Sequence, residues 1–268
     1  MFVDCHVHSS FSPDGKQTVF EACESAKQHQ LHGLIFTDHV DFDMLSHPDL
    51  SFDPIARKDA ITLAREQYGS ELHISEGVEL GFQSQVIGRM KEFVESYPFD
   101  FVILSTHGTD RLDCCDPRFH EKHSPIEACQ AYLDAIYRSV TEFDNFDVIG
   151  HIGYVLRYLP SRHTFREVAG CNERIDAILE QLVAKGKGLE INTSGYRHVM
   201  LGETLPADFI LRRFCELGGE IITLGSDGHM VKHVGFAFER AAAVARDSGF
   251  RQVAFFVQRK PVFISLDI

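Results

Sequence analysis

The sequence alternates short apolar segments with amphipathic ones, and this alternation constrains the fold more than any other feature. Most apolar segments are rich in β-branched residues and bounded by Gly, Asp or Ser, which is typical of strands buried on both faces of a parallel sheet. Eight segments fit this description: Phe2–Val7, Gly33–Thr37, His73–Leu80, Phe101–Ser105, Val148–Ile152, Gly188–Asn192, Glu220–Leu224 and Val253–Val257. Strands that alternate with helices favour βαβ units and a parallel sheet.

Helical patterns occupy the stretches between the strand-like segments. Ser124–Glu127 is a capping box with Pro at the first helical position, so a helix should begin there. Asn172 is expected to cap another helix, which Gly186 ends. Further helices are expected over Thr18–Gln30, Pro206–Leu217 and Ala237–Asp247.

The chain has 268 residues, a length that suits one α/β barrel or two smaller domains. It contains no linker, internal repeat or low-complexity tract, so we expect a single domain over residues 1–268. About seven or eight strand–helix units on one chain favour a closed or nearly closed barrel. A doubly wound open sheet is the alternative.

Histidines and carboxylates follow the strand-like segments at their carboxyl ends, which meet at one mouth of a parallel barrel. His6 and His8 are spaced i, i+2, so they lie on one face of a strand, about 6.7 Å apart along it. Asp14 lies in the loop after them. The strand ends and this loop supply nine candidate ligands: His6, His8, Asp14, His39, Glu79, His107, His151, Asp227 and His229.

This combination of side chains predicts a metal centre at the mouth. Imidazoles suit zinc, manganese and iron, and carboxylates can bridge two ions. Nine ligands are too many for one tetrahedral zinc, so the set indicates two to three divalent ions. A cluster of cations suits an anionic substrate such as a phosphate monoester.

The order His-x-His, Asp-His, Glu, His, His and Asp-x-His resembles the polymerase and histidinol phosphatase (PHP) superfamily, and the resemblance extends from His6 to His229. It implies a single distorted, TIM-like (β/α)₇ barrel with a trinuclear metal centre at its C-terminal mouth. Asp14 stands where some branches of the superfamily have His. The resemblance implies three ligand sets, namely His6, His8, Glu79 and Asp227 for one ion, Glu79, His107 and His151 for a second, and Asp14, His39 and His229 for a third.

Within the superfamily, the chain is most similar to the monofunctional histidinol-phosphate phosphatases. The segment Asn192–Arg197 resembles their phosphate-contacting loop, and the stretch from His151 to Pro160 resembles another. The similarity implies hydrolysis of L-histidinol phosphate, a step of histidine biosynthesis. Arg197 and Arg157 are the candidate phosphate ligands, because a guanidinium can donate two parallel hydrogen bonds to phosphate. Arg162 is an alternative to Arg157.

Glu79 and Asp227 are the candidate catalytic residues. Glu79 would bridge two ions, which neutralise the phosphoryl oxygens and activate water. Asp227 is a candidate general acid for the leaving alkoxide if it is not fully bound to metal. No covalent phosphoenzyme is required by this chemistry.

Composition bears on partners and compartment. A net charge of −13 disfavours nucleic acid and anionic membranes but permits a small phosphorylated substrate. The start of the chain resembles a strand and not a signal peptide, and its seven cysteines include no Cys-x-x-Cys pair. Both features indicate a reducing compartment, so we expect a cytoplasmic protein. The sequence leaves its oligomeric state open.

Three alternative functions are also compatible with these residues. The first is a PHP phosphoesterase that acts on another small phosphate ester or on a nucleotide. The second is a non-catalytic accessory domain of a polymerase assembly, which the complete ligand set disfavours. The third is an amidohydrolase barrel, which often uses a bridging lysine, and no lysine stands at an expected strand end here.

Overall fold

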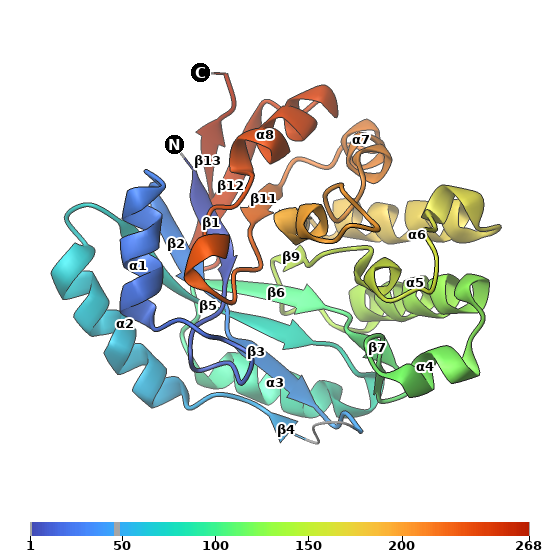
Figure 1. Ribbon diagram of the computed structural model, residues 1–268, viewed down its shortest axis with the longest axis horizontal. Helices are drawn as coiled ribbons and strands as arrows, with labels where there is room; N and C mark the ends of the chain where they lie inside the picture. The colour runs from blue at the N-terminus through green and yellow to red at the C-terminus, as the bar shows by residue number, and fades with distance from the viewer. Residues whose placement is uncertain (1, 46–48, 268) are drawn as a thin grey trace.

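The computed structural model describes residues 2–45 and 49–267. Seven parallel strands follow one another around a nearly closed barrel (Figure 1). They are β1 (Val3–Val7), β2 (Gly33–Phe36), β5 (His73–Gly81), β6 (Phe101–Ser105), β9 (Val148–Ile149), β10 (Gly188–Asn192) and β11 (Ile222–Gly225). The expected seven-stranded, TIM-like α/β barrel is therefore confirmed.

The barrel closes between β11 and β1 through loop and side-chain contacts. The backbone N–H of His8 donates to the carbonyl of Gly228 at 3.0 Å. The buried Asp4 carboxylate accepts from the N–H of Ser226 at 2.9 Å and from that of Gly235 at 2.8 Å. A side chain thus replaces part of the backbone ladder at this seam.

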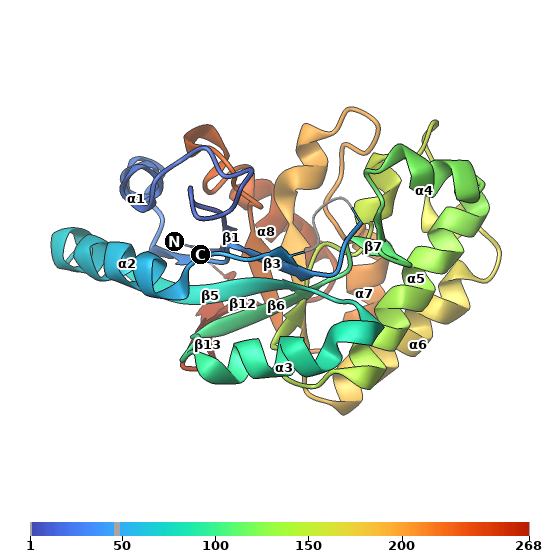
Figure 2. The same cartoon turned by 90° about the horizontal axis from the view of Figure 1, so that it is seen from below.

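Helices cover the outside of the strands (Figures 1 and 2). They are α1 (Val19–Gln28), α2 (Pro54–Tyr68), α3 (Ile87–Ser96), α4 (Pro117–Lys122), α5 (Pro125–Glu142), α6 (Cys171–Ala184), α7 (Asp208–Glu216) and α8 (Phe238–Asp247). The capping box at the start of α5 is confirmed. The expected cap of α6 was wrong, because Gly170 is its N-cap and Asn172 lies in the first turn. None of the described helices combines the length and apolar character that a membrane span needs.

Short strands extend the barrel at its carboxyl end. β3 (His39–Phe42) pairs in parallel with the end of β5 and antiparallel with β4 (Asp49–Leu50). A small hairpin of β7 (Gly108–Thr109) and β8 (Leu112–Asp113) follows β6. These additions build the walls of the mouth.

The eighth strand-like segment does not join the barrel. It forms β12 (Gln252–Val257), which pairs only with β13 (Lys260–Ser265) in an antiparallel hairpin. A two-residue turn joins these strands, so each finds its partner locally. Phe255 and Phe256 belong to the inner apolar cluster of the barrel, together with Val3, Ile35 and Phe101. The hairpin therefore closes the amino-end opening of the barrel and leaves the carboxyl-end mouth for function.

Candidate metal centre and phosphate pocket

The carboxyl ends of the strands surround a cavity of about 800 Å³. The nine residues predicted from the sequence line this cavity or lie directly beneath it, and short contacts connect them all. His6 and Glu79 project from β1 and β5. The remaining seven lie in β3 or in the turns after the barrel strands, namely His8, Asp14, His39, His107, His151, Asp227 and His229.

The fully buried Glu79 carboxylate lies at the centre of five imidazoles. Its Oε1 atom is 2.7 Å from Nε2 of His151 and 3.1 Å from Nε2 of His107. Its Oε2 atom is 2.9 Å from Nδ1 of His39, 3.1 Å from Nε2 of His6 and 3.3 Å from Nε2 of His8. One carboxylate therefore reaches ligand atoms on both sides, as a residue that bridges two cations must.

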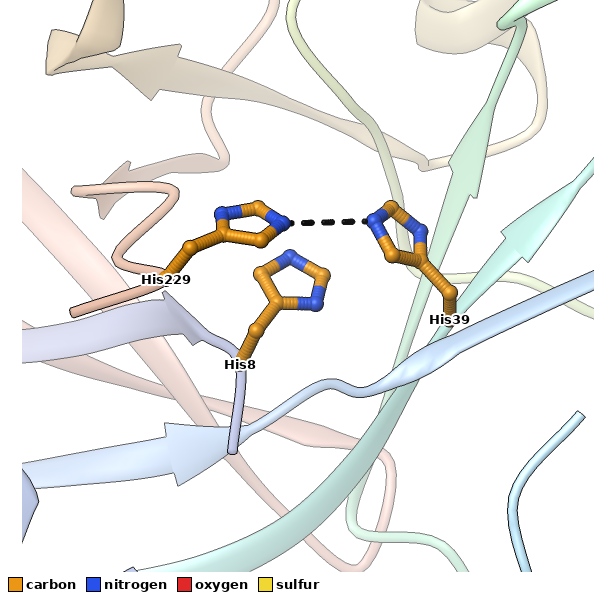
Figure 3. Close-up of side chains that lie close together, drawn as sticks. All are labelled: His8, His39 and His229. Atoms are coloured by element: carbon orange, nitrogen blue, oxygen red, sulfur yellow. Dashed lines mark hydrogen bonds between the residues drawn. The ribbon is translucent and has the colours of Figure 1, made fainter. Parts of the chain in front are cut away.

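Two further side chains, those of His229 and Asp14, extend this cluster towards solvent. The imidazoles of His8, His39 and His229 converge in Figure 3, where Nε2 of His229 lies 3.4 Å from Nε2 of His39. The ring of His8 stacks against both, 4.2 Å from the His39 centroid and 4.0 Å from the His229 centroid, and these two centroids are 5.6 Å apart. Asp14 contributes Oδ2 at 3.0 Å from Nε2 of His229, although its side chain is 58% exposed.

These donor atoms fit divalent cations. Glu79 Oε2 and His39 Nδ1 are buried and 2.9 Å apart without hydrogen-bond geometry, and neither has a hydrogen-bond partner elsewhere in the described part of the chain. Nε2 of His6 lies only 3.0 Å from Nε2 of His8. Such converging nitrogen and carboxylate donors match the ligand preferences of zinc, manganese and iron.

The ligand atoms form three groups, whose members differ in part from the three ligand sets expected from the sequence. His6, His8 and Glu79 form one group, and His8, His39 and His229 form another. His39 also belongs to the group with Glu79 and His107. His39 and His8 therefore connect groups that the sequence treated as separate.

Arg157 lies on the wall beside this cluster. Its Nη2 atom is 3.1 Å from Oδ2 of Asp227 and also donates to the Ser194 hydroxyl. Its Nε atom is buried without a partner among the described residues. Arg162 is exposed and does not line the cavity, so the geometry favours Arg157 over this alternative.

Arg197 also lines the cavity, but its guanidinium already donates two hydrogen bonds to backbone carbonyls. Nη1 donates to the carbonyl of Ser226 at 2.7 Å and Nη2 to the carbonyl of Asp227 at 2.9 Å. These bonds hold the turn in which Asp227 adopts a positive φ of 54°. Each Nη atom retains one N–H for a ligand.

The electrostatics of the carboxylates agree with ligand roles. Burial alone would raise the pKa of Glu79, but the surrounding His6, His39 and His107 hold it well below its usual range. Burial would also raise the pKa of Asp227, but His6 and Arg157 hold it well below the usual value. Asp227 is therefore ionised at neutral pH, which disfavours the general-acid role expected from the sequence.

The sequence matches the PHP domain family over residues 4–194. The chain belongs to this family. The family match covers His6 to His151, and the barrel places Asp227 and His229 beside them.

Relatives of this PHP chain match nearly its whole length. It is 31% identical over 255 residues to the histidinol-phosphatase of Lactococcus lactis, with 95% of this chain and 94% of that protein covered. It is 27% identical to a probable histidinol-phosphatase of Clostridium acetobutylicum, with 95% and 97% covered. The crystal structure of the L. lactis histidinol phosphate phosphatase, complexed with zinc, L-histidinol and phosphate, superposes with a TM-score of 0.90 at 30% identity, covering 97% of this chain and 98% of that one.

Two carboxylates that contact the histidines of the cluster were not predicted from the sequence. Glu190 accepts from Nδ1 of His6 at 2.6 Å, and Asp41 accepts from Nδ1 of His107 at 2.9 Å. Each bond directs the opposite ring nitrogen, Nε2, at Glu79. Such outer carboxylates orient metal-binding histidines. The signal for Glu190 was its charge between the apolar residues Leu189 and Ile191 of a buried strand.

Proposed function

We propose that this PHP-family chain is a metal-dependent phosphomonoesterase that hydrolyses L-histidinol phosphate to L-histidinol and phosphate. The observation that carries the proposal is the position of Arg157, a buried arginine with a free Nε–H beside a cluster of histidines and carboxylates. Full-length similarity to histidinol-phosphatases supports this substrate.

The cluster would hold two to three divalent ions, and zinc is our first choice because the L. lactis structure contains it. Glu79 would bridge two ions, with His6, His8 and Asp227 on one side and His107 and His151 on the other. Asp14, His39 and His229 would hold the outermost ion. Bound cations would neutralise the phosphoryl oxygens and make water nucleophilic at neutral pH.

The arginines would place the phosphate against this cluster. Arg157 offers Nε–H and the remaining Nη protons, and Arg197 offers the protons that its two backbone contacts leave free. A planar guanidinium fixes both the position and the orientation of a phosphate. Positioning of this kind supplies much of the rate enhancement in phosphoryl transfer.

The positively charged ammonium group of the substrate would meet a carboxylate on the same wall of the cavity. Asp113 lines the cavity and forms no ion pair with a described residue, unlike the other acidic lining residues Asp14, Asp41 and Asp227. The Tyr154 hydroxyl donates to its Oδ1 at 3.3 Å. Arg157 lies over the ring of the same tyrosine, 5.0 Å from its centroid. Asp113 would therefore receive the ammonium group of histidinol phosphate while Arg157 binds the phosphate.

Steady-state kinetics on three substrates would test the proposal. The metal-loaded protein is given L-histidinol phosphate, a simple alkyl phosphate and a nucleoside monophosphate. We expect the first to be preferred in kcat as well as in KM, because binding of its imidazole and amine helps to position the phosphoryl group. A flat profile or a preference for the nucleotide would instead indicate a general PHP phosphoesterase.

A further inference from the structure

The loop after β1 contains a buried serine that contacts the candidate metal centre. Ser12 is 1% exposed. Its hydroxyl oxygen lies 3.1 Å from Nδ1 of His8 and 3.0 Å from Oδ1 of Asp38, and it accepts from the backbone N–H of His39 at 3.0 Å. Ser12 thus touches two candidate metal ligands without facing the cluster itself.

Asp38 fixes this hydroxyl from behind. Its fully buried carboxylate also accepts from the backbone N–H of Ser9 at 2.7 Å and from the Ser9 hydroxyl at 3.0 Å. Arg57, which reaches in from α2, pairs with Asp38 at 3.4 Å and donates to the carbonyl of Gly77 at 2.8 Å. A buried ion pair of this kind is costly to form, so its geometry must be well supported.

Arg57 is itself immobilised by packing. It is 1% exposed, and its guanidinium lies over the Phe52 ring, 4.0 Å from the centroid. It also donates to the carbonyl of Phe36 at 3.3 Å. The chain of contacts from Arg57 through Asp38 to Ser12 is therefore anchored in α2 and in the strands beneath the mouth.

The hydrogen-bond roles along this chain determine the tautomer of His8. Ser12 has a single hydroxyl proton, and the Asp38 carboxylate is its strongest acceptor. The Ser12 oxygen must then accept a hydrogen bond from Nδ1–H of His8. Neutral imidazole has only one N–H, so Nε2 of His8 presents its lone pair to the cluster, 3.3 Å from Oε2 of Glu79.

In two other inner histidines, His6 and His107, a carboxylate accepts directly from Nδ1. Glu190 holds Nδ1 of His6, and Asp41 holds Nδ1 of His107. No carboxylate contacts Nδ1 of His8 among the described residues, and the serine stands in that place.

We propose that Ser12 is a positioning residue that transmits the orientation of the Asp38–Arg57 pair to His8 and so sets the metal affinity of the centre. This inference rests on the proposed metal centre but not on the identity of the substrate. Ser12 acts through His8 and touches neither substrate nor reacting atoms.

A pair of matched substitutions tests this role. Ser12→Ala and Ser9→Ala each remove one hydroxyl that donates to Asp38, but only Ser12 contacts His8. Zinc affinity is measured for the full chain by competition with a chromophoric chelator, and thermal melting reports folding. We expect affinity to fall about 10- to 100-fold in Ser12→Ala and to change less than about threefold in Ser9→Ala.

Kinetics at saturating zinc separate positioning from structural damage. Excess zinc should restore most of the kcat of Ser12→Ala and leave its KM near the wild-type value, because the ligands themselves remain. Unchanged zinc affinity in Ser12→Ala, or equal losses in both variants, would overturn the role of Ser12. Absence of zinc binding by the wild-type chain would instead contradict the proposed metal centre.

Discussion

Oε1 of Glu79 lies 2.7 Å from Nε2 of His151, although the two residues are 72 positions apart in the sequence. Glu79 belongs to β5 and His151 follows β9, with β6 between these strands. A contact across two strand spacings requires side chains that point into the barrel mouth from both sides. Glu79 thus connects His151 and His107 to His6 and His8, and removing its charge should affect the whole cluster.

Glu79→Gln should lose bound metal without unfolding. An amide keeps the size of the side chain but is a weaker ligand than a carboxylate, and the surrounding imidazoles lose their anionic partner. We expect more than one metal ion per wild-type chain by elemental analysis, at least one fewer in Glu79→Gln, and activity reduced by about 100-fold or more. Glu76→Gln is the control, because Glu76 lies on the same strand but pairs with Arg65. Wild-type metal content and hydrolysis in Glu79→Gln would show that the cluster is misassigned.

Arg157→Lys should impair hydrolysis while the metal content stays intact. Lysine keeps the positive charge but cannot reproduce a bidentate fork. Loss of a buried charge-assisted contact costs on the order of 2 to 4 kcal/mol, which corresponds to about 30- to 700-fold in kcat/KM. Arg162→Lys, an exposed change five residues along the same loop, should leave kcat/KM unchanged. Equal kinetics for the two variants would exclude Arg157 as the phosphate ligand.

The strand ends and their histidines could be predicted because they depend on local sequence. A short apolar segment followed by His or Asp indicates where a parallel strand ends. The barrel fold then brings the carboxyl ends of the strands together at one mouth. The same reasoning could not find the contact between Glu190 and His6. Their strands, β10 and β1, are separated by β11, so their meeting depends on how the barrel closes.

Two other differences between the structure and the sequence-based expectations have local physical causes. The helix α2 was not expected because Arg57 interrupts its apolar stripe, although the residue is buried beside Ile61 and Ala64. The β-branched character of Val253–Val257 was correctly interpreted as a strand. Its partner was not foreseeable from that segment alone, since the choice between barrel and hairpin depends on the turn at Gln258 and Arg259.

Asp113→Asn should change substrate preference and leave the chemistry intact. The substitution removes a negative charge from the cavity wall, while Asn can still accept from the Tyr154 hydroxyl. We expect kcat/KM for L-histidinol phosphate to fall about 10- to 150-fold, as for loss of a charged hydrogen bond of about 1.5 to 3 kcal/mol. Hydrolysis of a phosphate ester without an amine should be unaffected. Asp110→Asn, outside the cavity lining, is the matched control. A parallel loss on both substrates would assign Asp113 a structural role instead.

Metal binding should release protons at neutral pH. Burial alone would lower the pKa of His39, but Glu79 beside it raises the pKa to about 9 in the metal-free protein. His39 is therefore protonated at pH 7 until a cation displaces the proton, because only neutral imidazole can bind a metal. Because this proton competes with the cation below the pKa of His39, apparent metal affinity should rise as the pH increases from 7 to about 9, by up to about tenfold per pH unit for each proton released. Above the pKa of His39 this pH dependence of metal affinity should vanish.

Calorimetric titration with zinc in two buffers of different ionisation enthalpy at pH 7 measures how many protons are released on binding. Repetition at pH 9.5 shows whether the proton from His39 is no longer released. Heats that do not depend on the buffer at pH 7 would show that His39 is already neutral and that Glu79 does not raise its pKa.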